Sequence, residues 1–551
     1  MDSSLKHNER ILIIDEQVLS QSFLRYALEQ LNYQDITIAD RPQLALNLCR
    51  DHHYDLIICS YNQSGGKDGY HLYEELKLSG LQKHTTGVIF ISAETDPTLV
   101  HSVIELQPDE FMVKPFVIKD LQTRIERVVQ RKTQLRPLYQ LLDAHNYPAA
   151  LLYINAQLSV VSQRKWFPLL LKLKGDILLL QQQYHDAEHY FQAMLAIQPF
   201  SWAKMGLVRC YLQLEKEAEA FSELESMLMR SDSRLFALDL LAELEFKQQR
   251  YQVAQQHLID AADLAPRNLL RQQKLLQLSR LNHDYETQYR AAKDMVKFAR
   301  YSMFEQPDLY LNLARASIDF ALSSEDEEQA SRLNRQANQN LLQVQKQYSK
   351  HDITEQQQIL QARLLYLQDH KEKAKALLHD LKVDSPIRSL EDALDKAKAL
   401  HEVGLTDASE QLFEHINQFC LHQQTDPFFT AYLAQEKIER KKMPLSPREL
   451  NNNAVQQYQH GHWEQAYTAF SLAHKVMPNN AGIALNLWQT LLTSPRPLCP
   501  ATTERQLLLQ CQQVIEQARL KPEQQRRYDQ LKQKMQSPTA QDRNPDSAIS
   551  F

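Results

Sequence analysis

In residues 1–130, short hydrophobic runs typical of strands alternate with stretches of helical periodicity. Short runs of aliphatic and β-branched residues predict buried strands at Ile11–Ile14, Ile36–Ala39, Leu56–Cys59, Gly87–Ile91 and Glu110–Val113. Stretches of helical period separate them, at Leu19–Leu31, Gln43–Asp51, Tyr70–Leu78, Pro97–Leu106 and Ile118–Val129. Five strands that alternate with helices predict a doubly wound α/β domain with a five-stranded parallel sheet. Ligand chemistry is then expected at the carboxyl ends of the strands.

From Leu135 onward the strand signals vanish and only helical periods remain. Prolines interrupt these periods at Pro148, Pro168, Pro199, Pro266 and Pro307. One frame of small, aromatic and proline positions occurs three times, as Gly175, Tyr184, Ala187, Phe191 and Pro199, as Ala242, Tyr251, Ala254, Leu258 and Pro266, and as Ala454, Trp463, Ala466, Phe470 and Pro478. Such recurrence predicts stacked helical hairpins, with small residues at close helix contacts and aromatics filling the gaps.

Trp202, Met205, Gly206 and Ala218 resemble the opening pattern of the tetratricopeptide repeat, with Met in place of Leu. We therefore expect an all-α, tetratricopeptide-like helical solenoid after the α/β domain. The expected segments are an α/β domain at 1–132, repeats at 133–320, degenerate helical repeats at 321–445, a further repeat and helices at 446–535, and a disordered tail at 536–551.

The composition narrows the functional classes. Only 10 of the 551 residues are Gly, which favours helices. A formal net charge of -6 gives no general attraction to phosphate backbones or anionic lipids, so we expect neither nucleic acid nor membrane as a partner. The apolar stretch 166–180 is interrupted by Lys172, Lys174 and Asp176, and residues 1–10 lack the apolar core of a secretory signal. The cytoplasm is the expected location.

Polar residues stand at four of the five predicted strand ends. Asp15 and Glu16 follow the first strand, Ser60 the third, Ser92 the fourth, and Lys114 with Pro115 the fifth. In this order and register they resemble the receiver domain of two-component response regulators, and the resemblance covers residues 10–132. The whole layout is similar to a group of receiver-tetratricopeptide regulators of Gram-negative bacteria.

The resemblance assigns a role to each of these positions. An acidic pair and an acceptor aspartate bind Mg²⁺ in that family, together with a backbone carbonyl, which implies Asp15, Glu16 and Asn62 as metal ligands and Ser60 at the acceptor position. Ser92 and Lys114 match the residues that contact the phosphoryl group, and Phe111 matches the aromatic that reports the change.

Ser60 departs from the family pattern. An aspartate attacks phosphorus as an existing anion and coordinates a hard cation, whereas a serine hydroxyl needs a general base. Lys114 as a cation cannot serve as that base, and Asp55 cannot replace the acceptor because it begins its strand. The pattern thus indicates a pseudo-receiver with a weakened Mg²⁺ site and no catalytic residue. In the plainest alternative, the pocket is a relic that serves only the fold.

Two functions fit this combination of features. In the first, a phosphorylation-incompetent receiver acts in an adaptor whose repeat groove binds other proteins, with a sensor kinase or another response regulator as candidate partners. In the second, the receiver still switches in response to partner binding or another input and gates binding by the repeats. An enzyme is disfavoured because no P-loop, nucleophile elbow or zinc signature follows the α/β segment.

Overall fold

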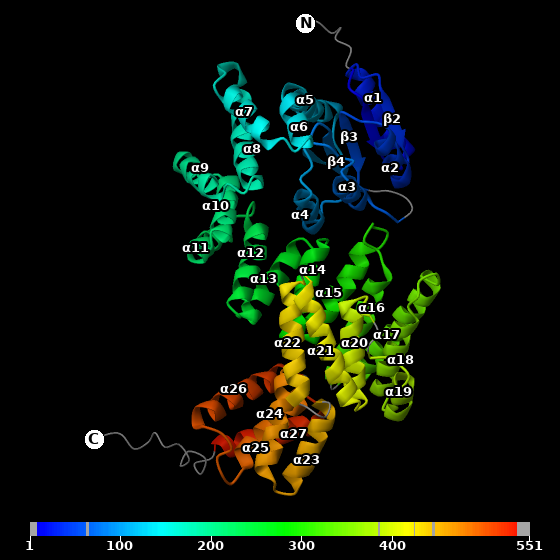
Figure 1. Ribbon diagram of the computed structural model, residues 1–551, viewed down its shortest axis with the longest axis vertical. Helices are drawn as coiled ribbons and strands as arrows, with labels where there is room; N and C mark the ends of the chain where they lie inside the picture. Colours follow the sequence, from blue (N-terminus) through cyan, green and yellow to red (C-terminus); the bar gives the residue numbers. More distant parts are fainter. Residues whose placement is uncertain are drawn as a thin grey trace, which may run out of the picture. The chain divides into compact units, whose positions relative to one another are not determined.

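The structure is a computed structural model that describes residues 8–61, 66–324, 326–383, 386–423, 425–442, 447–518 and 520–536 (Figure 1). It contains five strands near one end of the chain, followed by helices. The chain divides into two compact units. The first unit comprises residues 1–273 and 294–305, and the second comprises residues 274–293 and 306–551.

The five predicted strands are confirmed. They are β1 (Ile11–Ile14), β2 (Ile36–Ala39), β3 (Leu56–Ser60), β4 (Gly87–Ser92) and β5 (Glu110–Val113). They form one parallel sheet in the order β2-β1-β3-β4-β5. Ile14 pairs with Cys59, Ser60 with Ile91, and Ser92 with Val113, so these strands end along a single edge of the sheet.

Helices cover both faces of the sheet. The core between the sheet and one layer contains residues of α1 (Val18–Gln30) and α5 (Ile118–Gln134). The other core contains residues of α2 (Pro42–Asp51), α3 (Gly69–Leu78) and α4 (Pro97–Glu105). Each strand sends alternate side chains to the two layers. The expected doubly wound α/β domain is therefore present.

The helix α5 runs five residues further than the hydrophobic pattern predicts. Its last buried apolar residue is Val129, after which Arg131 and Lys132 bind the Asp109 carboxylate at 2.5 and 3.1 Å. Because ion pairs rather than apolar contacts hold this last turn, the apolar pattern ends early. The expected domain boundary between residues 132 and 133 thus lies inside α5, while the two compact units divide the chain within α14 and α15.

The rest of the first unit is helical. Its remaining complete elements are α6 (Arg136–Asp143), α7 (Tyr147–Leu158), η1 (Val161–Trp166), α8 (Phe167–Leu180), α9 (Tyr184–Ile197), α10 (Ser201–Gln213), α11 (Glu217–Met227), α12 (Arg234–Lys247) and α13 (Tyr251–Leu264). Pro148 and Pro168 lie in first helical turns, where the missing N–H costs nothing, and Pro199 and Pro266 lie between helices.

The same turn conformation recurs between the paired helices. Gln182, Glu215, Gln249 and His283 all have left-handed backbone with φ between 55 and 60°, and follow one another at intervals of 33, 34 and 34 residues. Glycine takes the equivalent conformation at Gly404, with φ of 86°. A regular repeat therefore exists even though most of its turns lack glycine.

Phe191 shows how small residues set the spacing between the hairpins. Its side chain is 1% exposed, and its ring lies where a Cβ on Gly175 or Gly206 would be, at 2.5 and 2.2 Å from the nearest ring atom. These glycines come from α8 and α10, on either side of the helix that carries Phe191. The predicted roles of the small and aromatic frame positions are thus confirmed at this hairpin.

The second unit is entirely helical in its described residues. It contains parts of α14 (Leu269–Leu281) and α15 (Tyr285–Ala299), followed by α16 (Pro307–Ser323), α17 (Glu327–Gln347), α18 (Thr354–Leu367), α19 (Lys371–Leu378), α20 (Leu390–Glu402), α21 (Thr406–His422), α22 (Pro427–Lys442), α23 (Pro447–Gln459), α24 (Trp463–Val476), α25 (Ala481–Thr493), α26 (Ala501–Gln517) and α27 (Pro522–Gln536). Of the tail expected at 536–551, Gln536 ends α27, and the rest lies outside the described residues. Over the described ranges, no helix is both long and apolar enough to cross a bilayer.

Ion pairs fill the interior of the second unit around α20. Every residue from Ala393 to Glu402 is buried, and several are charged. At the centre, the Arg363 guanidinium, 1% exposed, binds Asp319 and Asp395 at 2.7 Å each and holds Glu402 through two nitrogens. The Lys398 ammonium reaches the second oxygen of Asp319 at 3.1 Å. These ion pairs therefore connect three helices, α16, α18 and α20.

We expect Arg363→Met to lower the melting temperature of the second unit clearly. The variant keeps an unbranched stem but leaves three buried carboxylates without their shared cation, a change that typically costs about 3–5 kcal/mol. Circular dichroism during heating measures the effect. Arg388→Met is the matched control, because the Arg388 side chain is 80% exposed and its carboxylate partner lies 3.8 Å away. Equal melting temperatures for the two variants would contradict the importance of the network.

Candidate functional site

The carboxyl edge of the sheet brings three of the predicted site residues together, namely Asp15, Ser60 and Lys114. Asp15 follows β1, Ser60 ends β3, and the Lys114 side chain reaches Asp15 from the residue after β5. Asp15 and Ser60 are 1% and 2% exposed. The parallel order of the strands produces this gathering, because residues far apart in the chain end at the same sheet edge.

Internal donors satisfy both carboxylate oxygens of Asp15. Oδ2 accepts hydrogen bonds from the hydroxyls of Ser60 and Ser20, both at 2.5 Å, and from Lys114 Nζ at 3.2 Å. Oδ1 accepts from the backbone N–H of Gln17 at 2.9 Å. Lys114 also donates to Ser20 at 3.0 Å. The buried negative charge is thus balanced by one ammonium and three neutral donors, of which Ser20 was not anticipated from the sequence.

The expected Mg²⁺ ligands do not form a suitable set among the described residues. Asp15 is occupied by its donors, Glu16 is half-exposed beside it, and Ser60, which was expected at the acceptor position, offers a hydroxyl and no carboxylate. Asn62 lies outside the described residues. Where the structure is described, no group of three or more His, Cys, Asp or Glu side chains is placed to hold a metal ion. The donor set does not fit Mg²⁺, which prefers a near-octahedral arrangement of oxygens.

Ser92 and Phe111 are engaged in local structure. The Ser92 hydroxyl accepts from the backbone N–H of Glu94 at 2.9 Å and donates to its carbonyl at 3.2 Å, while being 1% exposed. The Phe111 ring stacks on the buried Phe90 ring, with centroids 6.1 Å apart and planes 15° apart. Ser92 therefore sits at the expected strand end but turns to its own loop, and Phe111 packs inward.

The segment after Ser60 returns to the sheet edge at the start of α3. The Gly69 N–H donates to the Tyr61 carbonyl at 2.7 Å, and a Cβ at Gly69 would lie 2.2 Å from the Ser60 carbonyl oxygen. Only glycine permits this approach. Asp68 precedes it as the N-cap of α3, accepting from the His71 N–H at 3.0 Å. The acceptor position is thereby joined directly to the segment containing Tyr61 and Asp68.

An arginine from beyond the α/β domain binds this segment within the first unit. Arg267, between α13 and α14, forms an ion pair with Asp68 at 2.8 Å and donates to the Tyr61 hydroxyl at 2.6 Å. Its guanidinium also lies over the Tyr61, Tyr70 and Phe298 rings, at 5.0–5.5 Å from their centroids. Burial alone raises the pKa of Asp68, but His71 and Arg267 outweigh it and lower the pKa to about 2.

A second arginine bridges the α/β domain and the helices. Arg271, whose side chain is 1% exposed, binds Glu105 of α4 at 2.6 Å and Asp239 of α12 at 2.7 Å. His71 adds a hydrogen bond between its Nε2 and the Phe298 carbonyl at 2.7 Å. Burial lowers the pKa of Arg271, but the two carboxylates outweigh it and raise the pKa above its ordinary value. The helical segment therefore contacts the α/β domain through permanent, buried charge.

The contacts of Arg267 and Arg271 were not predicted from the sequence. Both follow the break at Pro266, in a stretch where basic residues have an ordinary solvated interpretation. Arg271 stands between Leu270 and the polar run Gln272 to Lys274 at the start of α14, so the local pattern does not mark it as buried.

Known proteins match the N-terminal part of the chain. The family model of the response regulator receiver domain matches residues 11–126. A probable chemotaxis protein CheY of Rhizobium etli is 27% identical over 125 residues, which are 23% of this chain and 95% of that protein. A probable transcriptional regulator ycf27 of Guillardia theta is 28% identical over 131 residues, 24% of this chain and 49% of that protein. The matched region thus spans about half the length of the ycf27 relative.

Solved structures cover the same region. The receiver domain of Francisella response regulator 1452 is 25% identical and covers 22% of this chain and 98% of its own, with a TM-score of 0.20. The signal receiver domain of a histidine kinase from Syntrophus aciditrophicus is 27% identical and covers 22% of this chain and 90% of its own, with a TM-score of 0.21. With the family match, the sheet order and the residues at its carboxyl edge, residues 11–126 are a response regulator receiver domain.

Proposed function

We propose that the protein is a signalling adaptor in which a phosphorylation-incompetent receiver is joined to a protein-binding array of tetratricopeptide type. The observation that carries the proposal is the arrangement around Asp15. Its Oδ2 accepts from Ser60, Ser20 and Lys114, so the position of the acceptor carboxylate is taken by a hydroxyl that is itself hydrogen-bonded. The pocket is a closed set of partners rather than a reactive centre.

Chemistry supports this interpretation of the pocket. Attack by Ser60 on phosphorus would require a base to take its proton, and its nearest carboxylate, Asp15, is already paired with the Lys114 ammonium. A receiver built in this way serves as a docking module.

The helical part supports a role in protein binding. Its left-handed turns recur at intervals of 33 and 34 residues, close to the 34-residue period of tetratricopeptide repeats. Stacked hairpins of this type present an extended concave surface that binds peptides and protein faces. We propose protein partners in the cytoplasm, with a sensor kinase or another response regulator as candidates for the receiver, and we propose that the chain is not an enzyme.

Nucleic acid is a weaker candidate partner. Some receiver relatives are named as transcriptional regulators, but the match covers only about half of those proteins. The best basic run of this chain begins at Lys437, whose ammonium pairs with Glu414 on the neighbouring helix. A recognition helix would need free basic side chains aligned along one face.

A receiver that switches without phosphorylation is the second candidate, and a specific contact favours it. Arg267 holds Tyr61 and Asp68, which follow the acceptor position along the chain, and Arg271 holds Glu105 on α4. A partner that binds the receiver at these residues would compete with the helical segment. Binding of that partner would then release the helices from the receiver without any covalent change at Ser60.

We expect the wild-type receiver to take up no phosphoryl group from acetyl phosphate. The reason is that Ser60 lacks a carboxylate nucleophile and a base. Intact-protein mass spectrometry after incubation with acetyl phosphate and Mg²⁺ measures the outcome. A phosphorylated receiver, located by peptide mapping, would rule out the incompetent state.

Ser60→Asp provides the comparison for this experiment. The substitution places a second carboxylate next to Asp15, so we expect it to increase Mg²⁺ affinity and to lower the melting temperature in metal-free buffer through charge repulsion. Ser60→Asn is the matched control, since it adds similar bulk without charge. An equal response of both variants to Mg²⁺ would show that the other ligands no longer support metal binding.

We expect Arg271→Ala to loosen the contact between receiver and helices in the first unit. Loss of charge-assisted bonds to Glu105 and Asp239 should cost about 2 kcal/mol. Hydrogen–deuterium exchange of the α4 and α12 amides should therefore become faster, while the central strand β3 stays protected. Arg41→Ala is the control, because the Arg41 side chain is 69% exposed. Unchanged exchange in the Arg271 variant would show that the contact does not hold the two parts together.

A further inference from the structure

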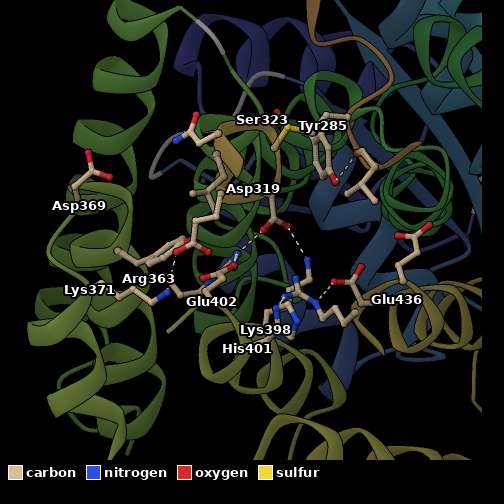
Figure 2. Close-up of a pocket in the computed structure, with 18 residues that line it drawn as sticks. Tyr285, Asp319, Ser323, Arg363, Asp369, Lys371, Lys398, His401, Glu402 and Glu436 are labelled. Atoms are coloured by element: carbon tan, nitrogen blue, oxygen red, sulfur yellow. Dashed lines mark hydrogen bonds and ion pairs between the residues drawn. The ribbon is translucent and has the colours of Figure 1, made fainter. Parts of the chain in front are cut away.

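A cavity of about 260 Å³ lies inside the second unit, among α16, α18, α20, α22 and α23 (Figure 2). Figure 2 shows Asp319 and Lys398 in its interior, and Asp369 and Lys371 further out. Asp319 and Lys398 are each 6% exposed, whereas Asp369 is exposed and lies in the turn between α18 and α19. The cavity thus has a buried, charged floor and an entrance at that turn.

Acids outnumber permanent cations in the cavity wall. The six acids are Asp319, Asp369, Glu402, Glu436, Glu439 and Glu449. The four permanent cations are Arg363, Lys371, Lys398 and Arg440. One histidine, His401, also lines the wall, and its Nδ1 lies 3.0 Å from the Arg440 guanidinium, an arrangement in which the ring nitrogen accepts and the ring is neutral. The wall therefore carries two negative charges in excess.

The acids on the floor are ionised. Burial alone raises the pKa of Glu436, but Arg440 and Lys398 outweigh it and lower the pKa to about 2. Burial also opposes ionisation of Asp319, yet Lys398 and Arg363 lower its pKa. Glu436 and Asp319 are therefore ionised at neutral pH and contribute to the excess of negative charge in the wall.

The charged residues next to the cavity wall do not offset its excess of acids. Arg280 is paired with Glu391 at 2.7 Å. Arg315 is shared between Asp392 and Asp395. Both cations are therefore engaged by carboxylates outside the cavity wall and do not offset the excess of acids in it. An excess of buried negative charge is unfavourable unless a cation lies close to it.

The uncharged part of the wall suits a long basic side chain. Tyr285 and Tyr366 provide aromatic faces, and Leu322, Val476 and Met477 provide aliphatic surface. Lysine and arginine combine an apolar stem with a cationic head, and both head groups interact favourably with aromatic rings and carboxylates. At the entrance, Asn452 is exposed and offers an amide for hydrogen bonds to a peptide backbone.

We propose that this cavity binds a lysine or arginine side chain presented by an extended segment of a partner protein. The acid excess attracts the cationic head, the aliphatic and aromatic wall contacts the stem, and the entrance residues contact the peptide around it. This inference rests on the proposed protein-binding function and names the chemistry of one partner. A free polyamine has the same charged group and is distinguished by the experiment.

The test is a selection of random peptides displayed on phage against the immobilised full-length protein. We expect selected peptides to be enriched in Lys and Arg over Asp and Glu, and a selected peptide, made synthetically and labelled, to bind more weakly as salt is raised. Replacing its basic residue by norleucine should weaken binding about tenfold or more. Spermidine, added alone, is tested for its effect on the melting temperature.

Variants at the entrance test whether the peptide binds in this cavity, and they leave the buried ion pairs unchanged. Asp369→Asn and Glu449→Gln each remove one negative charge, and asparagine tolerates the left-handed backbone at residue 369. We expect each to weaken binding of the labelled peptide about tenfold and the pair to weaken it further. Asp380→Asn is the matched control, since its side chain is 92% exposed and lies outside the wall. Circular dichroism confirms that all variants fold.

The possible results distinguish failure of the cationic site from failure of the proposed protein-binding function. Selected peptides without basic enrichment, or basic peptides equally bound by the entrance variants, would overturn the inference and leave protein binding by the helices intact. Stabilisation by spermidine with no selected peptide would overturn the peptide assignment and would count against the adaptor function as well. No selected peptide and no effect of spermidine would overturn the cationic site altogether.

Discussion

The need to pair every buried charge shapes both units of this protein. In the receiver, the 1% exposed carboxylate of Asp15 is held by an ammonium and by hydroxyl and amide donors. Between receiver and helices, the buried Arg271 is held by two carboxylates. In the second unit, Arg363 is surrounded by three. Ion pairs of this kind fix which elements lie next to each other, because removal of one partner leaves a charge that water cannot reach.

The receiver fold was predictable because its strands are apolar on both sides. Buried parallel strands appear as short continuous apolar runs, and all five were placed within one residue of their bounds. The strand ends were predictable for the same reason, so Asp15, Ser60 and Lys114 could be expected to meet. The orientations of Ser92 and Phe111 were not predictable. Whether a side chain points into the pocket or toward its own loop depends on the local backbone geometry.

The second unit was harder to predict because its buried surfaces carry charge. From residues 321 to 445 the repeat pattern is weak in the sequence, yet α16 to α22 are well-formed helices. The helix α20 contains Asp395, Lys396 and Lys398, which an apolar-periodicity argument assigns to solvent, although each is at most 6% exposed. Their charged partners lie 32 to 80 residues away, and no local pattern reveals such pairs.

The pairing of Asp15 at the sheet edge, and the pairing between the receiver and the helices, together suggest a structural role for Ser60. An aspartate at residue 60 would place a second carboxylate beside that of Asp15 and would need a cation to be tolerated, whereas the serine hydroxyl donates a hydrogen bond to Asp15 at 2.5 Å. The next residue, Tyr61, is held by Arg267 from the helical segment. Paired charges at the sheet edge and the contacts of Arg267 thus hold Tyr61 and Asp68 in one arrangement, which the proposed docking function requires.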